Sequence, residues 1–136
     1  MKSKQSQVIF AVIFVFLIGL CFIFVGQVKY EIIENEIKLS GTLTKSTTIK
    51  FNEIQSIEYI ENLEIGTRDI GLGTFKMEIG SYSNEEYDKY KLYAYASVEH
   101  YIVIKYNDKV LLFNQSTIDS TRSIYNTLKS KLEKVQ

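Results

Sequence analysis

The chain has 136 residues, with 16 basic and 16 acidic side chains, one histidine and one cysteine. This length allows one ordinary folded domain beside a short terminal segment. The balanced charge gives no electrostatic reason to bind nucleic acid. The single cysteine, Cys21, excludes an intrachain disulfide and a cysteine metal cluster.

An uncharged, apolar run from Val8 to Val25 dominates the N-terminal part of the chain. A helix rises about 1.5 Å per residue and a bilayer has a hydrocarbon core of about 30 Å, so this run is long enough to cross it. We therefore predict that residues 1–28 form a short basic N-terminus and a transmembrane helix over about residues 7–26. Residues 8–25 would contact the lipid bilayer.

A cleaved signal peptide is the alternative interpretation of this run. Signal peptides have apolar regions of about 7–15 residues that end before a small-residue cleavage site. Here the run is longer, and it ends in Phe24-Val25-Gly26-Gln27. The sequence therefore favours an uncleaved anchor.

Flanking charges suggest an orientation for this anchor. Lys2 and Lys4 precede the run, whereas Lys29 and Lys38 follow it. Positive flanks tend to stay in the cytoplasm. We therefore expect a single-pass protein of the cell membrane, with its N-terminus cytoplasmic and its C-terminal domain extracytoplasmic.

Residues 29–136 are predicted to form one domain, because apolar and polar residues alternate there with the period of β-strands. The strand-like runs are 30–34, 36–40, 42–51, 56–61, 75–79, 87–96, 101–106 and 109–113, and we expect about seven strands. Asn107-Asp108 is a suitable two-residue hairpin turn. The glycine-rich segment 66–73 is predicted to be the main loop, and residues 80–86 a polar connection.

An amphipathic helix is predicted over about residues 116–134. Ser116 and Asp119 have the spacing of a weak capping box. Apolar residues then recur at helical spacing: Ile118, Ile124, Tyr125, Leu128, Leu132 and Val135. Such a helix needs an apolar surface on which to pack.

About seven antiparallel strands followed by one helix resemble the pleckstrin-homology (PH) plan. The segment Arg68-x-x-Gly71-x-Gly73-x-Phe75, the tyrosine-containing strand to Ala96 and Ile102-Val103-Ile104 resemble bacterial PH-like domains carried on small membrane proteins. The resemblance implies a mainly β fold, a PH-like bent seven-stranded antiparallel barrel or sandwich capped by one C-terminal α-helix. It also implies a binding module for a protein or peptide partner.

Phosphoinositide binding is not expected from this domain. The PH domains that bind these lipids have clustered lysine and arginine at their first hairpin, where this chain has Glu34-Asn35-Glu36. Beyond Lys2 and Lys4 the chain has 14 basic and 16 acidic residues. This charge does not attract anionic headgroups.

No motif predicts catalysis, a metal site or a cofactor. His100 is the sole histidine, which rules out a two-histidine metal site, and we expect it to have a surface or turn role. Gly71-x-Gly73-x-x-Lys76 lacks the third glycine of a dinucleotide motif. We expect a protein that is not an enzyme.

A strip of aromatic and basic residues is the candidate partner-binding site. Tyr93 and Tyr95 alternate with Leu92 and Ala94, so we expect both tyrosines to be exposed, beside Lys89 and Lys91. Arg68, in the glycine-rich segment, is expected to reach a partner from a flexible rim. These five basic and aromatic residues are predicted to bind an unidentified protein. The alternatives are a structural role of the tyrosines in half-buried strands and a position of the strip near the lipid headgroups.

The sequence thus predicts a non-enzymatic, single-pass membrane protein that presents a PH-like binding module. The alternative is a structural or assembly component that acts through its transmembrane helix. Gly19 has no glycine partner four residues away, so no Gly-xxx-Gly face supports tight helix pairing. This absence favours the binding module.

Overall fold

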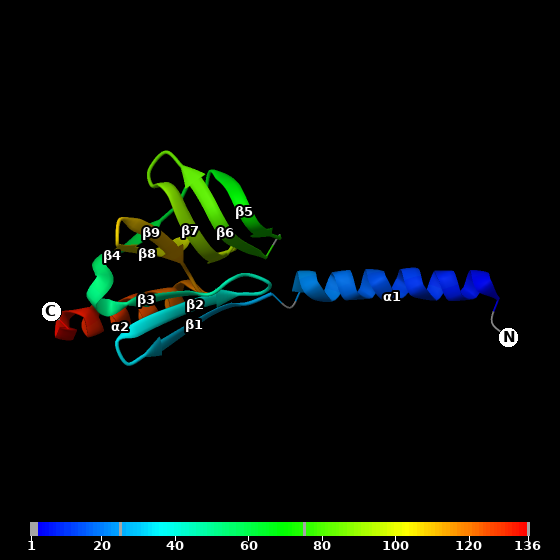
Figure 1. Ribbon diagram of the computed structural model, residues 1–136, viewed down its shortest axis with the longest axis horizontal. Coiled ribbons are helices and arrows are strands. Elements are labelled where there is room, and N and C mark those ends of the chain that lie inside the picture. The colour runs from blue at the N-terminus through cyan, green and yellow to red at the C-terminus, as the bar shows by residue number, and fades with distance from the viewer. Residues whose placement is uncertain (1–2, 25, 75, 136) are drawn as a thin grey trace.

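A computed structural model describes residues 3–24, 26–74 and 76–135. Lys2, Val25 and Phe75, on which some sequence predictions depend, lie outside the described residues. Helix α1 (Lys4–Phe24) projects away from the folded domain (Figure 1). Among the described residues it is the one helix that is long and apolar enough to cross a membrane. The chain is therefore compatible with a single-pass membrane protein, with the helix shifted by a few residues from the predicted 7–26.

The domain begins with a three-stranded antiparallel sheet. It consists of β1 (Val28–Ile33), β2 (Glu36–Gly41) and β3 (Thr47–Lys50), in the order β1-β2-β3. The predicted strand 42–51 is wrong in part, because residues 42–46 form the β2–β3 connection and Phe51–Glu53 form a short 3₁₀ helix, η1. A single run of Thr and Ile does not reveal that the chain turns within it.

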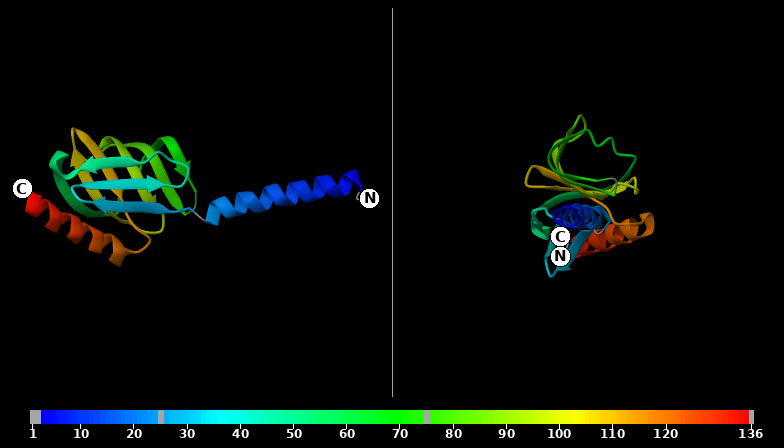
Figure 2. Two further views of the ribbon diagram at one scale, coloured as in Figure 1. Left: turned by 60° about the horizontal axis from the view of Figure 1, so that its bottom comes forward. Right: turned by 90° about the vertical axis from the view of Figure 1, so that its right-hand side faces the viewer.

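A six-stranded sheet follows. Its strands are β4 (Ile54–Glu61), β5 (Thr67–Gly73), β6 (Met77–Asn84), β7 (Asp88–Tyr95), β8 (His100–Tyr106) and β9 (Lys109–Phe113). They lie in the order β4-β8-β9-β7-β6-β5. The three-stranded sheet lies across one side of this larger sheet (Figure 2).

Two features of the predicted barrel need correction. The described residues form nine strands rather than about seven, and β7 pairs with β9 in parallel, so the strands are not all antiparallel. The predicted main loop, residues 66–73, contains edge strand β5, and the predicted connection 80–86 continues β6 to Asn84. Most of β5 is exposed, so its polar residues do not show the alternation of a half-buried strand.

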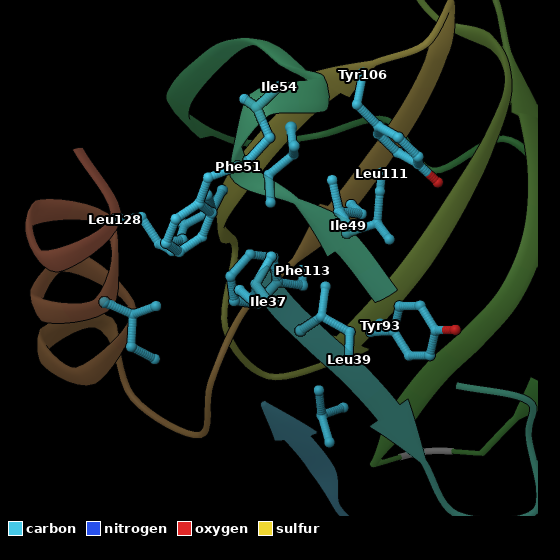
Figure 3. Close-up of a cluster of buried hydrophobic side chains, with 14 of the residues drawn as sticks. Ile37, Leu39, Ile49, Phe51, Ile54, Tyr93, Tyr106, Leu111, Phe113 and Leu128 are labelled. Carbon is cyan, nitrogen blue, oxygen red and sulfur yellow. The ribbon is translucent and has the colours of Figure 1, made fainter. Parts of the chain in front are cut away.

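The main hydrophobic core fills the space between the two sheets. Figure 3 shows these buried side chains, among them Ile37 and Leu39 of β2, Ile49 of β3 and Phe113 of β9. A second core lies on the other face of the six-stranded sheet, around Leu92, Val103 and Leu112. Both faces of the central strands are therefore buried.

Helix α2 (Ile118–Val135) confirms the predicted C-terminal helix. Its start is fixed by Thr117 and Ser120: Ser120 N donates to Thr117 Oγ1 at 3.0 Å, and Thr117 N donates to Ser120 Oγ at 3.3 Å. This reciprocal pair replaces the predicted one of Ser116 and Asp119. The buried side of α2 packs against β4, β8 and η1, and Leu128 points toward Phe51 (Figure 3).

Candidate functional site

A groove of about 390 Å³ lies between the β2–β3 connection and the outer part of the six-stranded sheet. We call it the β5–β7 groove. Residues 43–45 form one wall, and residues of β5, β6 and β7 form the other. Gly71 and Gly80 contribute backbone without side chains, so part of the floor is peptide backbone.

Two aliphatic residues at the groove are largely exposed to solvent. Leu43 is 76% exposed and Ile70 is 77% exposed, which makes them the most exposed large hydrophobic residues of the described domain. Exposed apolar side chains that line one concave surface are typical of an interaction site. Sequence reasoning missed both, although the immediate neighbours of each in the chain are polar residues or glycine.

Two lysines add positive charge to the same groove. Lys91 Nζ donates a hydrogen bond of 3.2 Å to Thr47 Oγ1, while the exposed Lys45 lies in the opposite wall. Among the described residues that line this groove there is no aspartate or glutamate. The described lining therefore combines two ammonium groups with three aliphatic residues (Leu43, Ile70 and Ile79) and three hydroxyl-bearing residues (Thr44, Ser81 and Tyr93).

Tyr93 anchors the wall formed by the β2–β3 connection. Its hydroxyl donates to the Lys45 carbonyl at 2.8 Å and lies 2.8 Å from Thr47 Oγ1. The prediction that Tyr93 is exposed is wrong, since only 4% of the residue is accessible. The three-stranded sheet covers this face of β7, and this burial raises the pKa of Tyr93.

Tyr95 is also less exposed than predicted. It is half-buried against the main core, and its hydroxyl accepts a hydrogen bond of 3.1 Å from Val28 N. Tyr95 therefore fixes the start of β1 to the larger sheet. Alternation on β7 located the two tyrosines on one face correctly, but it could not reveal that a second sheet covers that face.

Lys89 and Arg68 lie in different surroundings. Lys89 and Lys91 share a second hollow of about 290 Å³, which continues from the β5–β7 groove and also contains Asp69 and Lys109. Arg68 instead forms an ion pair with Glu78 at 3.8 Å. The structure thus brings Lys89, Lys91 and Tyr93 to one face and leaves Arg68 in a separate pair.

His100 is the first residue of β8 and its side chain is mostly buried, so the predicted turn or surface role is wrong. Its Nδ1 lies 2.7 Å from the Tyr59 hydroxyl and 3.7 Å from Glu61 Oε1. Within the described parts of the chain, no three His, Cys, Asp or Glu side chains are grouped so that they could hold a metal ion. The β5–β7 groove is therefore the best-supported candidate site.

Comparison of the chain with protein-family models, curated proteins and solved structures finds no match. The lining residues of the groove are therefore the basis for inferring a ligand. This lining suits a ligand that offers apolar groups together with an anionic or hydrogen-bonding group.

Proposed function

We propose that the chain is a non-enzymatic, single-pass membrane protein whose domain presents the β5–β7 groove to a protein or peptide partner. The observation that carries this proposal is the exposed Ile70 beside Lys91 in one wall of a groove whose other wall is formed by residues 43–45. Helix α1 would hold the domain at the membrane, with the N-terminus cytoplasmic and the domain extracytoplasmic. Protease added to wall-free intact cells should then digest the domain without prior lysis.

The chemistry of the groove suggests the kind of segment that would dock. An apolar side chain would cover Ile70 and remove its surface from water. A carboxylate nearby would pair with the Lys91 ammonium group, which already lies against Thr47. A segment with both features, rather than a phosphoinositide, is the proposed ligand.

The domain resembles the PH plan in part. Strands followed by a C-terminal helix that packs on the sheet support this resemblance. The parallel pairing of β7 with β9 departs from the antiparallel plan. The proposal for the groove does not depend on this resemblance, because a fold alone does not fix a function.

Site-specific photocrosslinking in intact membranes tests the proposal. A photoreactive residue replaces Ile70 in the full-length chain, and matched variants carry it at Ser130 on the exposed side of α2 or at Phe16 in α1. We expect a discrete protein adduct at position 70 that is weaker with Lys91→Glu and absent at position 130.

Two results would contradict the binding module. Adducts at position 16 alone would favour the alternative, in which the chain assembles through its transmembrane helix. Adducts to lipid alone at position 70 would show that the groove contacts the bilayer and not a protein partner. Either outcome is read from the mass of the crosslinked species.

A further inference from the structure

The β2–β3 connection, residues 41–46, lies where α1 joins the domain. Gln27 N donates to Thr42 Oγ1 at 3.0 Å, and Thr42 N donates to the Gln27 carbonyl at 3.3 Å. Gln27 is three residues beyond Phe24, the last residue of α1. Three residues of chain span at most about 10 Å, so Gln27 lies within about 10 Å of the helix end, and Thr42 is hydrogen-bonded to Gln27.

The first residues of the domain are firmly attached, so no long linker separates it from α1. Gly26 is buried, and Val28 N donates to the Tyr95 hydroxyl at 3.1 Å. Gln115 Nε2 also donates to the Val28 carbonyl at 3.3 Å. The end of the domain that contains residues 41–46 therefore lies next to the C-terminal end of α1 (Figure 1). If α1 spans a membrane, this end of the domain faces the membrane surface.

Leu43 is an unusual residue at this position. Its φ is +59°, a left-handed conformation in which glycine or asparagine is favoured, and its side chain is 76% exposed. The six residues 41–46 include Lys45 and no acidic side chain. A bulky apolar side chain that is displayed on a strained backbone indicates a contact outside the domain.

We propose that residues 41–46 contact the membrane surface, with Leu43 inserted at the boundary between headgroups and acyl chains and Lys45 beside the lipid phosphates. This inference rests on the proposed anchoring of the chain by α1. The headgroup layer is about 5–8 Å thick on each side of the hydrocarbon core, a thickness of the same order as the separation of the turn from Phe24. Lysine and an adjacent apolar side chain suit that layer.

The far end of the three-stranded sheet has the opposite character. Strand β1 carries the chain away from α1, by about 20 Å over its six residues. The hairpin there contains Glu34 and Glu36, which an anionic membrane surface would repel. Contact at residues 41–46 would therefore fix the rotation of the domain about α1. The groove wall formed by residues 43–45 would then lie at the membrane, and Ile70 and Lys91 in the other wall would remain accessible to the protein partner.

A depth measurement with a single fluorescent label tests this contact. Cys21→Ser removes the sole cysteine, and Leu43→Cys then carries an environment-sensitive dye on the full-length chain. Ile33→Cys is the matched control, because Ile33 is also an exposed apolar residue but lies at the far end of β1. The chain is reconstituted in phosphatidylcholine vesicles that contain a minor fraction of phosphatidylglycerol.

We expect spin-labelled lipid to quench the dye at position 43 and not at position 33, and aqueous dithionite to reduce it several-fold more slowly at position 43. Vesicle flotation is measured on the same samples. Equal accessibility of both labels on floating vesicles would overturn the membrane contact and leave the anchor intact. Failure to float would overturn both the anchor and the contact.

A second variant separates contact from folding. Leu43→Asn tolerates the same positive φ, so its Tm should not fall. A dye at Lys45→Cys should nevertheless lose most of its quenching by spin-labelled lipid in this variant. Undiminished quenching would show that the Leu43 side chain does not hold the turn at the membrane.

Discussion

Gly71 and Gly80 face each other directly across β5 and β6, with φ values of +145° and +141°. A Cβ on either glycine would lie 2.1 Å from a carbonyl oxygen of the facing strand and 2.6 Å from the facing Cα. The register also shifts nearby, between Arg68 and Ile70. The close approach of the two backbones gives the β5–β7 groove part of its floor.

Gly80→Ala should therefore destabilise the domain. Strained backbone and overpacking each cost about 1–3 kcal/mol, so we expect the free energy of unfolding to fall by about 2–6 kcal/mol. Thermal unfolding of the full chain in detergent, followed by circular dichroism, measures this change. Gly19→Ala is the control, because a Cβ there meets nothing within 4 Å. Equal Tm values for the two variants would contradict the close approach of β5 and β6.

Leu128→Ala tests the attachment of α2 to the main core. Leu128 is completely buried, and truncation of a buried leucine costs about 2–5 kcal/mol. This is a large fraction of the roughly 5–15 kcal/mol that stabilises an ordinary domain, so we expect a clear fall in Tm.

Lys129→Ala is the matched control on the exposed side of the same helix. Lys129 Nζ lies 6.0 Å from the centre of the Tyr125 ring, and an exposed contact of this kind contributes about 0.5–1 kcal/mol. Its loss should therefore lower Tm much less than Leu128→Ala does. Similar Tm values would mean that α2 is not packed on the sheets.

Hydrophobic alternation was sufficient to locate strands that bury at least one face. The β8–β9 hairpin is confirmed, with Asn107 and Asp108 at positive φ between paired Tyr106 and Lys109. Edge strand β5 was missed, because exposure on both sides leaves no alternation to detect. The parallel pairing of β7 with β9 depends on contacts between distant segments, which local pattern does not encode.

The predicted exposure of residues on β7 is confirmed only in part for the same reason. Lys89 and Lys91 are exposed, as the alternation predicts. Tyr93 is buried because the three-stranded sheet covers its face of β7. The alternation of Tyr93 with Leu92 shows that they lie on opposite faces, but it does not show that both faces are covered. Leu43 and Ile70 line one groove only because the fold brings the β2–β3 connection beside β5.

Asn114 is a further residue whose role only the fold reveals. It is fully buried: Oδ1 accepts from Tyr95 N at 2.6 Å, and Nδ2 donates to the Val98 carbonyl at 2.8 Å. Asn114→Leu would leave these backbone groups buried without partners, at about 1–3 kcal/mol each. We expect a loss of about 2–6 kcal/mol in chemical denaturation, against little change for exposed Asn126→Leu. A loss below 1 kcal/mol, on the order of one ordinary hydrogen bond, would contradict this role.

Alkaline pH should unfold the domain, because burial raises the pKa of six tyrosines: Tyr82, Tyr87, Tyr90, Tyr93, Tyr101 and Tyr106. The pKa of Tyr87 rises to about 12, against about 10 for an unfolded tyrosine. The folded state holds these protons more tightly, so their contribution to stability is complete below about pH 10 and is lost as pH rises toward 12. We expect Tm to fall steeply across that interval, together with the appearance of tyrosinate absorbance. Tyr101→Phe should lessen the fall, whereas a constant Tm up to pH 12 would contradict the burial of these hydroxyls.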